Sequence, residues 1–580
     1  MRKLIDMVNK NLVITLLIFL LTVPVNAQIK NQETGLKREV TLYNPYKPSL
    51  PVVKKRSFLP DMNDTTKVRP DFKYDINTTP FMPEYLISPI KAASLLPDPL
   101  PKLYKSFVNF GLGNYFTPLA ELSISNERSK KGAIGLYARH FSTNGKVPLK
   151  NDKKVFAGYM DNDVSLFGKK FFRKNLLEGS LDFSQKIRYA YGYDTSFMDY
   201  NPTKKEIRLG YDNAGAKLSF ASSTLDSSSL SYDFDLRYDF FHQSKSMFSH
   251  NVDIKGIMAK SYKGFYAGSG IEYDYTGVSE SVWNKPKYIA SLSPFIKKST
   301  LQWEFKLGFK ALLEKNLTNS PVFHLYPDIN FGFNIVPSYI RFFTALGGNL
   351  EKNDPKAIID VNPFLIPDGR LFKAPNTDNS LIVTAGVLGN NGMNGNYLLS
   401  ASYSVINDML FYSNLVYPDS LFINEHGNYF IELPDDVELF KIHGEMSGAI
   451  TDKLSFSAKG NYYDYSLSEQ IYAWNKPEWD ARLGLKYNLK NKILAGAELT
   501  AIGPRKQIVT RDITVPVPLV SPIGFGMPTH INLNLSAEYR YTKILSFWMK
   551  FNNISNNRYY EWAYYPSQRF LFMVGFTYSL

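Results

Sequence analysis

The stretch Leu230-Ser-Tyr-Asp-Phe-Asp-Leu-Arg-Tyr-Asp-Phe240 decides the fold, because apolar and polar residues alternate along all of it. Successive side chains of a β-strand point to opposite faces, so this period of two predicts a strand with one apolar and one charged face. The stretch matches the about 9–11 residues with which a tilted strand crosses a bilayer, whereas soluble strands average about 5–6. A polar inner face behind an apolar outer wall is typical of a membrane β-barrel.

The same alternation recurs along the chain from residue 105 onward. Further examples are Ile531–Arg540, Leu454–Lys459, Ala481–Tyr487 and the final strand, which places Phe570, Phe572, Val574, Phe576, Tyr578 and Leu580 on one face. We count 22 to 24 such segments and recognise no helical segment between them. Closure removes the exposed strand edges that lipid cannot accommodate. We therefore expect an all-β fold, a large antiparallel transmembrane β-barrel of about 22 strands (20 or 24 as alternatives), over residues 105–580.

Connection lengths in the C-terminal part support this prediction. Tight turns are expected at 451–453, 488–492 and 541–543, and long connections at about 464–478, 505–528 and 552–568. Short turns at one end and long loops at the other are typical of outer-membrane barrels, with the short turns periplasmic. Other large loops are expected at about 351–377 and 417–436, and Asp212-Asn-Ala-Gly215 is interpreted as a hairpin turn.

Two segments precede the predicted barrel. Residues 1–27 resemble a cleaved secretory signal peptide, with a positively charged start, an apolar run at Leu12–Val23 and a small-residue cleavage site at Val25-Asn-Ala27. The alternative is an uncleaved anchor helix. Residues 28–104 hold eleven of the 33 prolines and a single glycine, which prevents long helices and central strands. We expect a short irregular periplasmic arm, either a flexible tether or a strap that lies on a partner or in the lumen.

Catalytic and metal-binding signatures are missing from the sequence. The chain has no cysteine, which excludes disulfides, thiolate metal sites, a cysteine nucleophile and a lipoprotein anchor. Seven histidines are scattered without a helical pair or an HExxH motif: His140, His242, His250, His324, His426, His443 and His530. No GxSxG or nucleotide-binding glycine motif is present. We therefore expect no enzyme, no cofactor and no metal, and we predict no catalytic or binding residue.

Two weaker patterns leave alternatives open. A barrel hydrolase needs a Ser–His arrangement brought together in space, and His140 is near Ser142 while His250 is beside Ser249. Whether either pair meets depends on the tertiary structure. Pro434-Asp-Asp436 is interpreted as a solvated loop, with a weak Ca²⁺ site as the alternative.

The aromatic and basic composition fits a membrane location. Aromatic residues make up 15% of the chain, and Tyr and Trp prefer membrane interfaces. Tyr559–Tyr565 is interpreted as an outer girdle or a loop base, and Trp548 as a mid-strand residue. The formal net charge of +14 is interpreted as membrane-surface or lumen charge rather than as a nucleic-acid site, because an exported chain rarely meets nucleic acid.

The C-terminal part resembles the end of TonB-dependent receptor barrels. Asn532–Tyr541, Asn552–Tyr560 and Pro566–Arg569 are similar to the family's penultimate strands, its "N-L-F-N-x-x-Y" turn and its "P-G-R" before the last strand. Ser555 replaces the usual Phe of that turn, and Gln568 the usual Gly.

Upstream, Val383–Gly389 resembles the family's "E-L-G-L-K-G" strand without its acid, and Gly444-Glu445 resembles its "G-x-E" element. The resemblance covers about residues 377–580, whereas residues 105–376 fit by strand spacing only. The family's plug domain exceeds a hundred residues, so residues 28–104 are too short for it. Arg38–Tyr43 faintly resembles a TonB box, with a plain extended segment as the alternative. The whole chain resembles the plug-less TonB-receptor-like barrels of the Bacteroidota.

These patterns predict a protein of the bacterial outer membrane. The resemblance implies a transport-type channel or receptor-like pore, with a polar lumen that residues 28–104 would fill. The alternative is a structural or assembly subunit that uses the barrel as a platform. Expected partners are outer-membrane lipid and an envelope protein bound through residues 28–104 or the long loops, with no nucleic acid; the substrate is not identified.

Overall fold

The computed structural model describes residues 104–580 apart from 127–128, 196–200, 224–228, 245–246, 280–284, 317–319, 366–373, 391–394, 417–425 and 511–522. The predicted signal peptide, and the predicted arm except Tyr104, lie outside the described residues. In the part that is described, no helix is long and apolar enough to cross a membrane.

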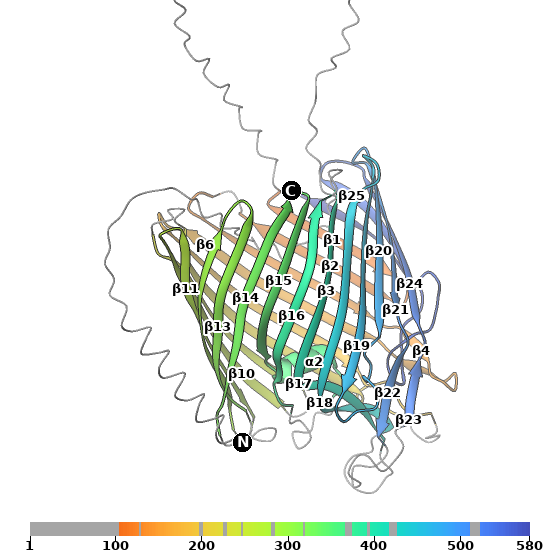
Figure 1. The fold of residues 1–580 in the computed structure, drawn as a ribbon. Helices are drawn as coiled ribbons and strands as arrows, with labels where there is room; N and C mark the ends of the chain where they lie inside the picture. The colour runs from red at the N-terminus through yellow and green to blue at the C-terminus, as the bar shows by residue number, and fades with distance from the viewer. Residues whose placement is uncertain are drawn as a thin grey trace, which may run out of the picture.

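Twenty-two antiparallel strands of the described chain close into one barrel (Figure 1). They are β1 (Ser106–Gly113), β2 (Thr117–Ser125), β3 (Gly132–Thr143), β6 (Tyr159–Phe171), β7 (Asn175–Tyr189), β8 (Arg208–Ser222), β9 (Ser231–Gln243), β10 (Met247–Tyr262), β11 (Phe265–Val278), β12 (Lys287–Ser299), β13 (Trp303–Lys315), β14 (Val322–Val336), β15 (Ile340–Glu351), β16 (Thr377–Asn390), β17 (Asn396–Val416), β18 (His426–Ala449), β19 (Leu454–Leu467), β20 (Trp479–Leu489), β21 (Ile493–Ile502), β24 (His530–Arg540), β25 (Leu545–Asn552) and β28 (Leu571–Ser579). The predicted fold class and strand number are confirmed.

The first and last strands complete the barrel. β1 pairs with β28 in the register Phe107↔Ser579 to Gly113↔Met573. The backbones of Ser106 and Leu580 exchange two hydrogen bonds of 2.9 Å. Because every strand of the barrel has two neighbours, no strand edge is left open along the wall.

The alternation seen in the sequence becomes two faces of the wall. On β9, Leu236 and Tyr238 are 45% and 41% exposed, although they are large and apolar. Arg237 and Asp239, on the other face, form an ion pair of 2.5 Å. The apolar face therefore points outward, and the charged face points into the lumen, as expected for a wall surrounded by lipid.

The two ends of the barrel differ in their connections. The turns predicted at 451–453, 488–492 and 541–543 are confirmed, and they lie at the end where Leu580 closes on β1. We call this the turn end. The long connections 144–158, 190–207, 352–376, 468–478, 503–529 and 553–570 all join strand ends at the opposite end of the barrel, which we call the loop end (Figure 1).

Several long connections carry structure of their own. They contain the hairpins β4 (Lys146–Pro148) with β5 (Lys154–Phe156), β22 (Arg505–Thr510) with β23 (Ile523–Met527), and β26 (Tyr560–Trp562) with β27 (Tyr565–Pro566). β22 also runs parallel to the end of β17. The connection 352–376 contains α2 (Pro355–Val361), a helix that the sequence analysis did not recognise.

Two loop predictions are wrong in position. Asp212-Asn-Ala-Gly215 lies inside β8, because both neighbouring strands hold it. Asn213 Nδ2 donates to Asp239 Oδ1 at 3.0 Å, and a residue with turn propensity is thus used as a lumen hydrogen-bonding group. The loop predicted at 417–436 is shorter, because β18 already begins at His426.

Candidate functional site

A segment at the loop end folds inward and forms the candidate site. We call the described residues 352–365 and 374–376 the cap segment; they connect β15 to β16. Its helix begins where Asp354 Oδ1 accepts a 2.8 Å hydrogen bond from Ala357 N and Pro355 occupies the first turn. Aspartate before proline is a strong helix start, because the carboxylate caps a free N–H and the proline lacks one. In Figure 1, α2 is seen within the barrel near the loop end.

A network of buried polar groups holds the base of the cap segment. Lys287, at the start of β12, donates from Nζ to Ala374 O at 2.6 Å and to Asn353 O at 3.3 Å. Asn353 N donates to Asn376 Oδ1 at 3.0 Å, and Asn376 Nδ2 donates to Glu314 Oε1 at 2.8 Å. Lys287, Asn353, Asn376 and Glu314 are all less than 9% exposed. One buried lysine thus clamps both ends of the cap segment to the wall.

Ion pairs reinforce this attachment on two sides. Lys352 contacts Asp274, Asp253 at 3.5 Å and Asp354 at 3.6 Å. Burial alone would lower the pKa of the Lys352 amine, but these three carboxylates outweigh it and raise that pKa above its usual value.

On α2, Asp360 pairs with Lys186 of β7 at 2.7 Å and with Lys356 at 3.1 Å. Burial would raise the pKa of the Asp360 carboxyl, yet the two lysines lower it below its usual value. The helix is therefore tied electrostatically to a strand far from the one that precedes the cap segment.

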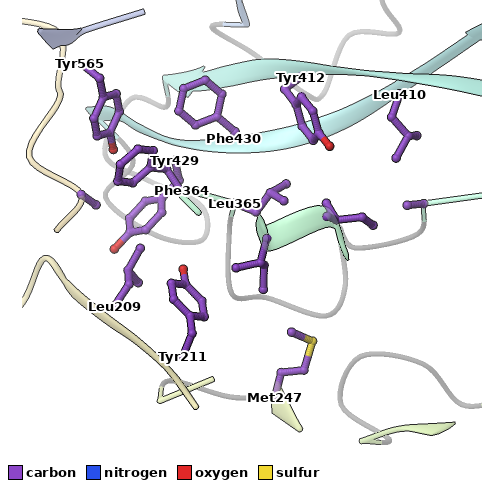
Figure 2. Packing of buried hydrophobic residues seen from close by; sticks show 14 of the residues in the cluster. Leu209, Tyr211, Met247, Phe364, Leu365, Leu410, Tyr412, Tyr429, Phe430 and Tyr565 are labelled. Carbon is purple, nitrogen blue, oxygen red and sulfur yellow. The ribbon is translucent and has the colours of Figure 1, made fainter. Parts of the chain in front are cut away.

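An apolar cluster spans the barrel at this level. One side of the cluster comes from β8–β10: Leu209, Tyr211, Phe241 and Met247. The other side comes from β17 and β18: Leu410, Tyr412, Tyr429 and Phe430. The cap segment packs between these two sides through Ile358, Ile359, Phe364 and Leu365. β8–β10 and β17–β18 are separated by six strands of the wall, so only a segment that crosses the lumen can connect them. Figure 2 shows the cap segment between the two groups of side chains. Tyr211 OH donates to Pro363 O at 2.5 Å and fixes the crossing.

The hairpin β26–β27 packs against the same cluster. The Tyr565 ring stacks on Phe364 with centroids 4.0 Å apart, and its hydroxyl donates to Asn428 O. Tyr191, in the β7–β8 connection, meets Tyr565 edge-on at 5.0 Å. Tyr565 is 1% exposed, so this part of Tyr559–Tyr565 is a packed loop base and not a girdle facing lipid.

Beneath the cap segment the lumen wall carries charges of both signs in pairs. Inward-facing examples are Lys255 with Glu272 (2.8 Å), Lys310 with Glu272 (3.0 Å), Lys306 with Asp328 (2.5 Å), Arg341 with Glu304 (3.2 Å) and Lys217 with Asp235 (3.2 Å). Trp548 also points inward, is 8% exposed, and donates to Asn109 Oδ1 at 2.7 Å. The lumen is therefore a polar space that can accommodate water and hydrophilic solutes.

The structure separates one Ser–His pair and joins the other. Ser249 is fully buried on the lumen face, whereas His250 points outward and pairs with the Tyr238 hydroxyl at 2.7 Å. His140 Nε2 lies 3.1 Å from Ser142 Oγ. All seven histidines lie on strands.

No group of three or more metal-ligating side chains occurs in the described residues. Asp435 is 4% exposed and lies in β18, not in a solvated loop. Its carboxylate accepts hydrogen bonds from the backbone N–H groups of Asp436, Glu469 and Gln470 at 2.9 to 3.0 Å. Asp435 thus holds the β19–β20 connection against β18.

The cap segment was missed by sequence reasoning, although it carried a signal. Asp354-Pro355 is a helix start, and Pro363 just beyond the helix is a stop, so a short helix was predictable. Its position inside the barrel was not, because that depends on which strands lie across the lumen.

No protein-family model matches the sequence, and no curated protein matches it either. Solved structures are similar in fold: the FrpB iron transporter from Neisseria meningitidis (F3-3 variant) has a TM-score of 0.63 at 10% identity over 83% of this chain and 82% of that chain. The copper transporter OprC has a TM-score of 0.60 at 12% identity over 83% and 82%. The pyoverdine outer membrane receptor FpvA from Pseudomonas aeruginosa PAO1, bound to pyoverdine, has a TM-score of 0.58 at 11% identity over 83% and 79%. At these identities the likeness shows a shared barrel fold.

Proposed function

We propose that this protein is an outer-membrane transport barrel whose polar lumen conducts a solute and whose cap segment gates the outer mouth. The observation that carries this proposal is the cap segment packed between separated walls, above a lumen lined with charged pairs. On this proposal the turn end would face the periplasm and the loop end the outside, because outer-membrane barrels have short periplasmic turns and long outer loops. The names of the structural neighbours, two transporters and a receptor, support a transport role.

The finer parts of the proposal rest on the sequence. Residues 1–27 would direct export and be removed, and residues 28–104 would form a periplasmic arm too short for a plug. The arm would lie in the lumen or bind an envelope protein. The chain would belong with the plug-less receptor-like barrels of the Bacteroidota.

Lys287 is the residue through which we expect the gate to open. Its ammonium holds both ends of the cap segment at once, through Ala374 O and Asn353 O. A hydrogen bond from a charged group contributes about 1.5–3 kcal/mol. Loss of this clamp would shift the cap segment toward an undocked state while the wall of the barrel stays paired.

Planar-bilayer conductance of the full chain tests the gate. Lys287→Met should raise the open probability by about tenfold or more, because one charged clamp is worth at least about 1.4 kcal/mol. Lys306→Met is the matched control, since Lys306 pairs with Asp328 on the wall, and both residues lie on strands of the barrel. Equal open probability of wild type, Lys287→Met and Lys306→Met would contradict gating by the cap segment.

A cross-link tests whether the cap segment must move. The chain has no native cysteine, so the pair Lys186→Cys with Asp360→Cys can be bridged selectively by a bifunctional thiol-reactive linker that a reductant cleaves, joining β7 to α2. We expect the bridged pair to abolish solute flux in liposome swelling and reduction of the linker to restore it. The control pair, Asn109→Cys with Glu121→Cys, joins neighbouring strands and should leave flux unchanged. No flux in any state, together with a stoichiometric envelope partner, would favour the platform role instead.

A further inference from the structure

A chain of polar side chains crosses the outer face of the barrel near the loop end. It consists of Ser142 and His140 on β3, Asn162 on β6, Gln185 on β7 and Asp212 on β8. Its members are neighbours in strand register, since His140 is opposite Asn162, Asn162 opposite Gln185 and Gln185 opposite Asp212.

The orientation of this chain follows from the residues beside it. Lys186 binds Asp360 of α2 in the lumen, so its neighbour Gln185 points outward. Tyr211 binds Pro363 of the cap segment, so Asp212 points outward as well. Asn162 and His140 are hydrogen-bonded to this outward row. The chain therefore faces the surrounding membrane and not the lumen.

Hydrogen-bond direction along the chain is set by its carboxylate. Asp212 can only accept when ionised, so Gln185 donates from Nε2 to Asp212 Oδ1 at 2.8 Å and its Oε1 is an acceptor. Asn162 then donates from Nδ2 to Gln185 Oε1 at 3.1 Å, which leaves Asn162 Oδ1 as an acceptor.

That acceptor determines the tautomer of His140. Its Nδ1–H donates to Asn162 Oδ1 at 2.6 Å, so in the neutral imidazole Nε2 is the unprotonated nitrogen. Ser142 Oγ lies 3.1 Å from Nε2 and donates a hydrogen bond to it. Nucleophile, base and orienting group are thus arranged as in a serine hydrolase.

The surroundings indicate the class of substrate. Directly toward the turn end, the same outward faces carry Ile134 (62% exposed), Val164 (42%), Leu181 (60%) and Phe183 (45%). The small residue Ala120 is opposite His140 on β2. This chain of polar side chains, which we call the relay, therefore lies at the boundary between the loop-end rim and the apolar wall. At that level the ester groups of membrane lipids meet their acyl chains.

We propose that Ser142, His140 and Asn162 form a membrane-facing serine hydrolase site whose substrate is a carboxylic ester linking an acyl chain to a membrane lipid. The sequence alone predicted no enzyme; the register of β3 and β6 supplies the orienting residue that the sequence did not show. This activity is separate from solute transport and uses the opposite face of the wall.

The reaction balances with water as the only co-reactant. Ser142 Oγ attacks the ester carbonyl carbon, and its proton passes to His140 Nε2. The bond from the carbonyl carbon to the lipid alkoxy oxygen breaks, and His140 protonates that oxygen to release an alcohol. Water then attacks the acyl carbon while His140 takes its proton. The bond from that carbon to Ser142 Oγ breaks, and His140 returns the proton to Oγ, which releases the fatty acid and restores the serine.

A second chain on the lumen face provides an internal contrast. His443 Nδ1 contacts Asn461 Oδ1 at 2.7 Å, and Asn461 Nδ2 donates to Asp480 Oδ1 at 2.9 Å. The residue two places after this histidine is Glu445, whose carboxylate lies 3.3 Å from His443 Nε2. This chain has a histidine and an orienting amide but a carboxylate in place of the hydroxyl, so it should be inert.

The test uses the full chain purified in detergent, with mixed micelles of a diacyl phosphatidylcholine as substrate and fatty-acid release as the readout. Wild type should release fatty acid, and Ser142→Ala and His140→Ala should lose at least about 100-fold in rate. His443→Ala, in the lumen chain, should keep the wild-type rate. Heat-modifiable gel mobility confirms that each variant is a folded barrel.

Covalent labelling gives a readout that does not depend on turnover. A long-chain alkyl fluorophosphonate should label wild type, and mass spectrometry should place the adduct on Ser142. Ser165→Ala removes a hydroxyl on the lumen face and should leave labelling intact. The proposal is overturned if wild type neither takes the label nor releases fatty acid, or if Ser142→Ala retains either property.

Asn162 is a positioning residue, and its variants should separate orientation from binding. Asn162→Leu should lower kcat with KM unchanged, whereas Asn162→Asp keeps the acceptor and should restore most of kcat. Cleavage of water-soluble short-chain esters without cleavage of micellar lipid would overturn the assignment of a lipid substrate.

Discussion

The two ends of the barrel are held by different kinds of contact. At the turn end, several side chains bond within their own turn: Thr542 Oγ1 accepts from Leu545 N, three residues on, at 2.9 Å. At the loop end, the cap segment is held by partners far away in sequence. Lys287 and Ala374 are 87 residues apart, and Tyr211 and Pro363 are 152 residues apart.

If the cap segment is the gate that we propose, this difference would allow one barrel to be rigid and gated at once. A local turn forms together with its hairpin and costs little to close. The cap segment exists only because the closed wall brings its partners together, so it can undock without unpairing a strand. Substitutions at the turn end should therefore leave permeability unchanged, whereas substitutions at the loop end should alter it.

Removal of the cap segment should have the largest effect. Asn353 N is 3.0 Å from Asn376 Oδ1, so a short Gly-Ser linker can replace residues 355–374 without straining β15 or β16. The mouth would then stay open, and bilayer conductance should rise to a constant open level. The same linker inserted in the turn at 490–492 should leave the conductance unchanged. A rise in conductance with that insertion would contradict the difference between the two ends.

Loss of the aromatic stack should come next. Phe364→Ala removes the ring stacked on Tyr565, and deletion of a buried phenylalanine costs about 3–5 kcal/mol. Undocking should increase by roughly 100-fold or more. Maleimide labelling of Ala374→Cys, at a position only 1% exposed, measures undocking because the chain has no other cysteine. An unchanged labelling rate would show that the ring does not hold the cap segment.

Acid should loosen the cap segment more moderately. The pKa of Asp360 is lowered by Lys186 and Lys356, although burial opposes this shift. The stabilisation of the docked cap segment by ionised Asp360 is therefore constant above the ordinary carboxyl pKa of about 3.9. It is lost as the pH falls through the lower pKa that Asp360 has in the docked state. Open probability should be flat from about pH 8 to 5 and rise below about pH 4. Asp360→Asn should show a higher open probability that no longer depends on pH in this range.

Changes at the turn end should have the smallest effect. Thr542→Ala removes an acceptor for the N–H groups of Leu545 and Ile544, which should cost about 0.5–1.5 kcal/mol of folding stability. The urea midpoint, followed by heat-modifiable gel mobility, should fall slightly while conductance stays at the wild-type level. A conductance change as large as that of Phe364→Ala would refute the difference between the turn end and the loop end.

Much of the fold was readable from local patterns. The period of two along Leu230–Phe240 became β9 with the expected faces, and the turns at 451–453, 488–492 and 541–543 were placed correctly. The reading failed at Asp212-Asn-Ala-Gly215, where turn-forming residues lie inside a strand because both neighbours pair with it. Local propensity is a weak prior against two complete strand partners.

The candidate sites divide in the same way. The sequence by itself determined that Ser142 and His140 share a face, because residues two apart in a strand always do. It also contained the helix start at Asp354-Pro355. Only the tertiary structure decided that Asn162 orients His140 and that α2 lies across the lumen, since register and barrel closure set which distant residues meet. Period and turn chemistry are properties of neighbouring residues, whereas the relay and the cap segment depend on the closed order of the strands.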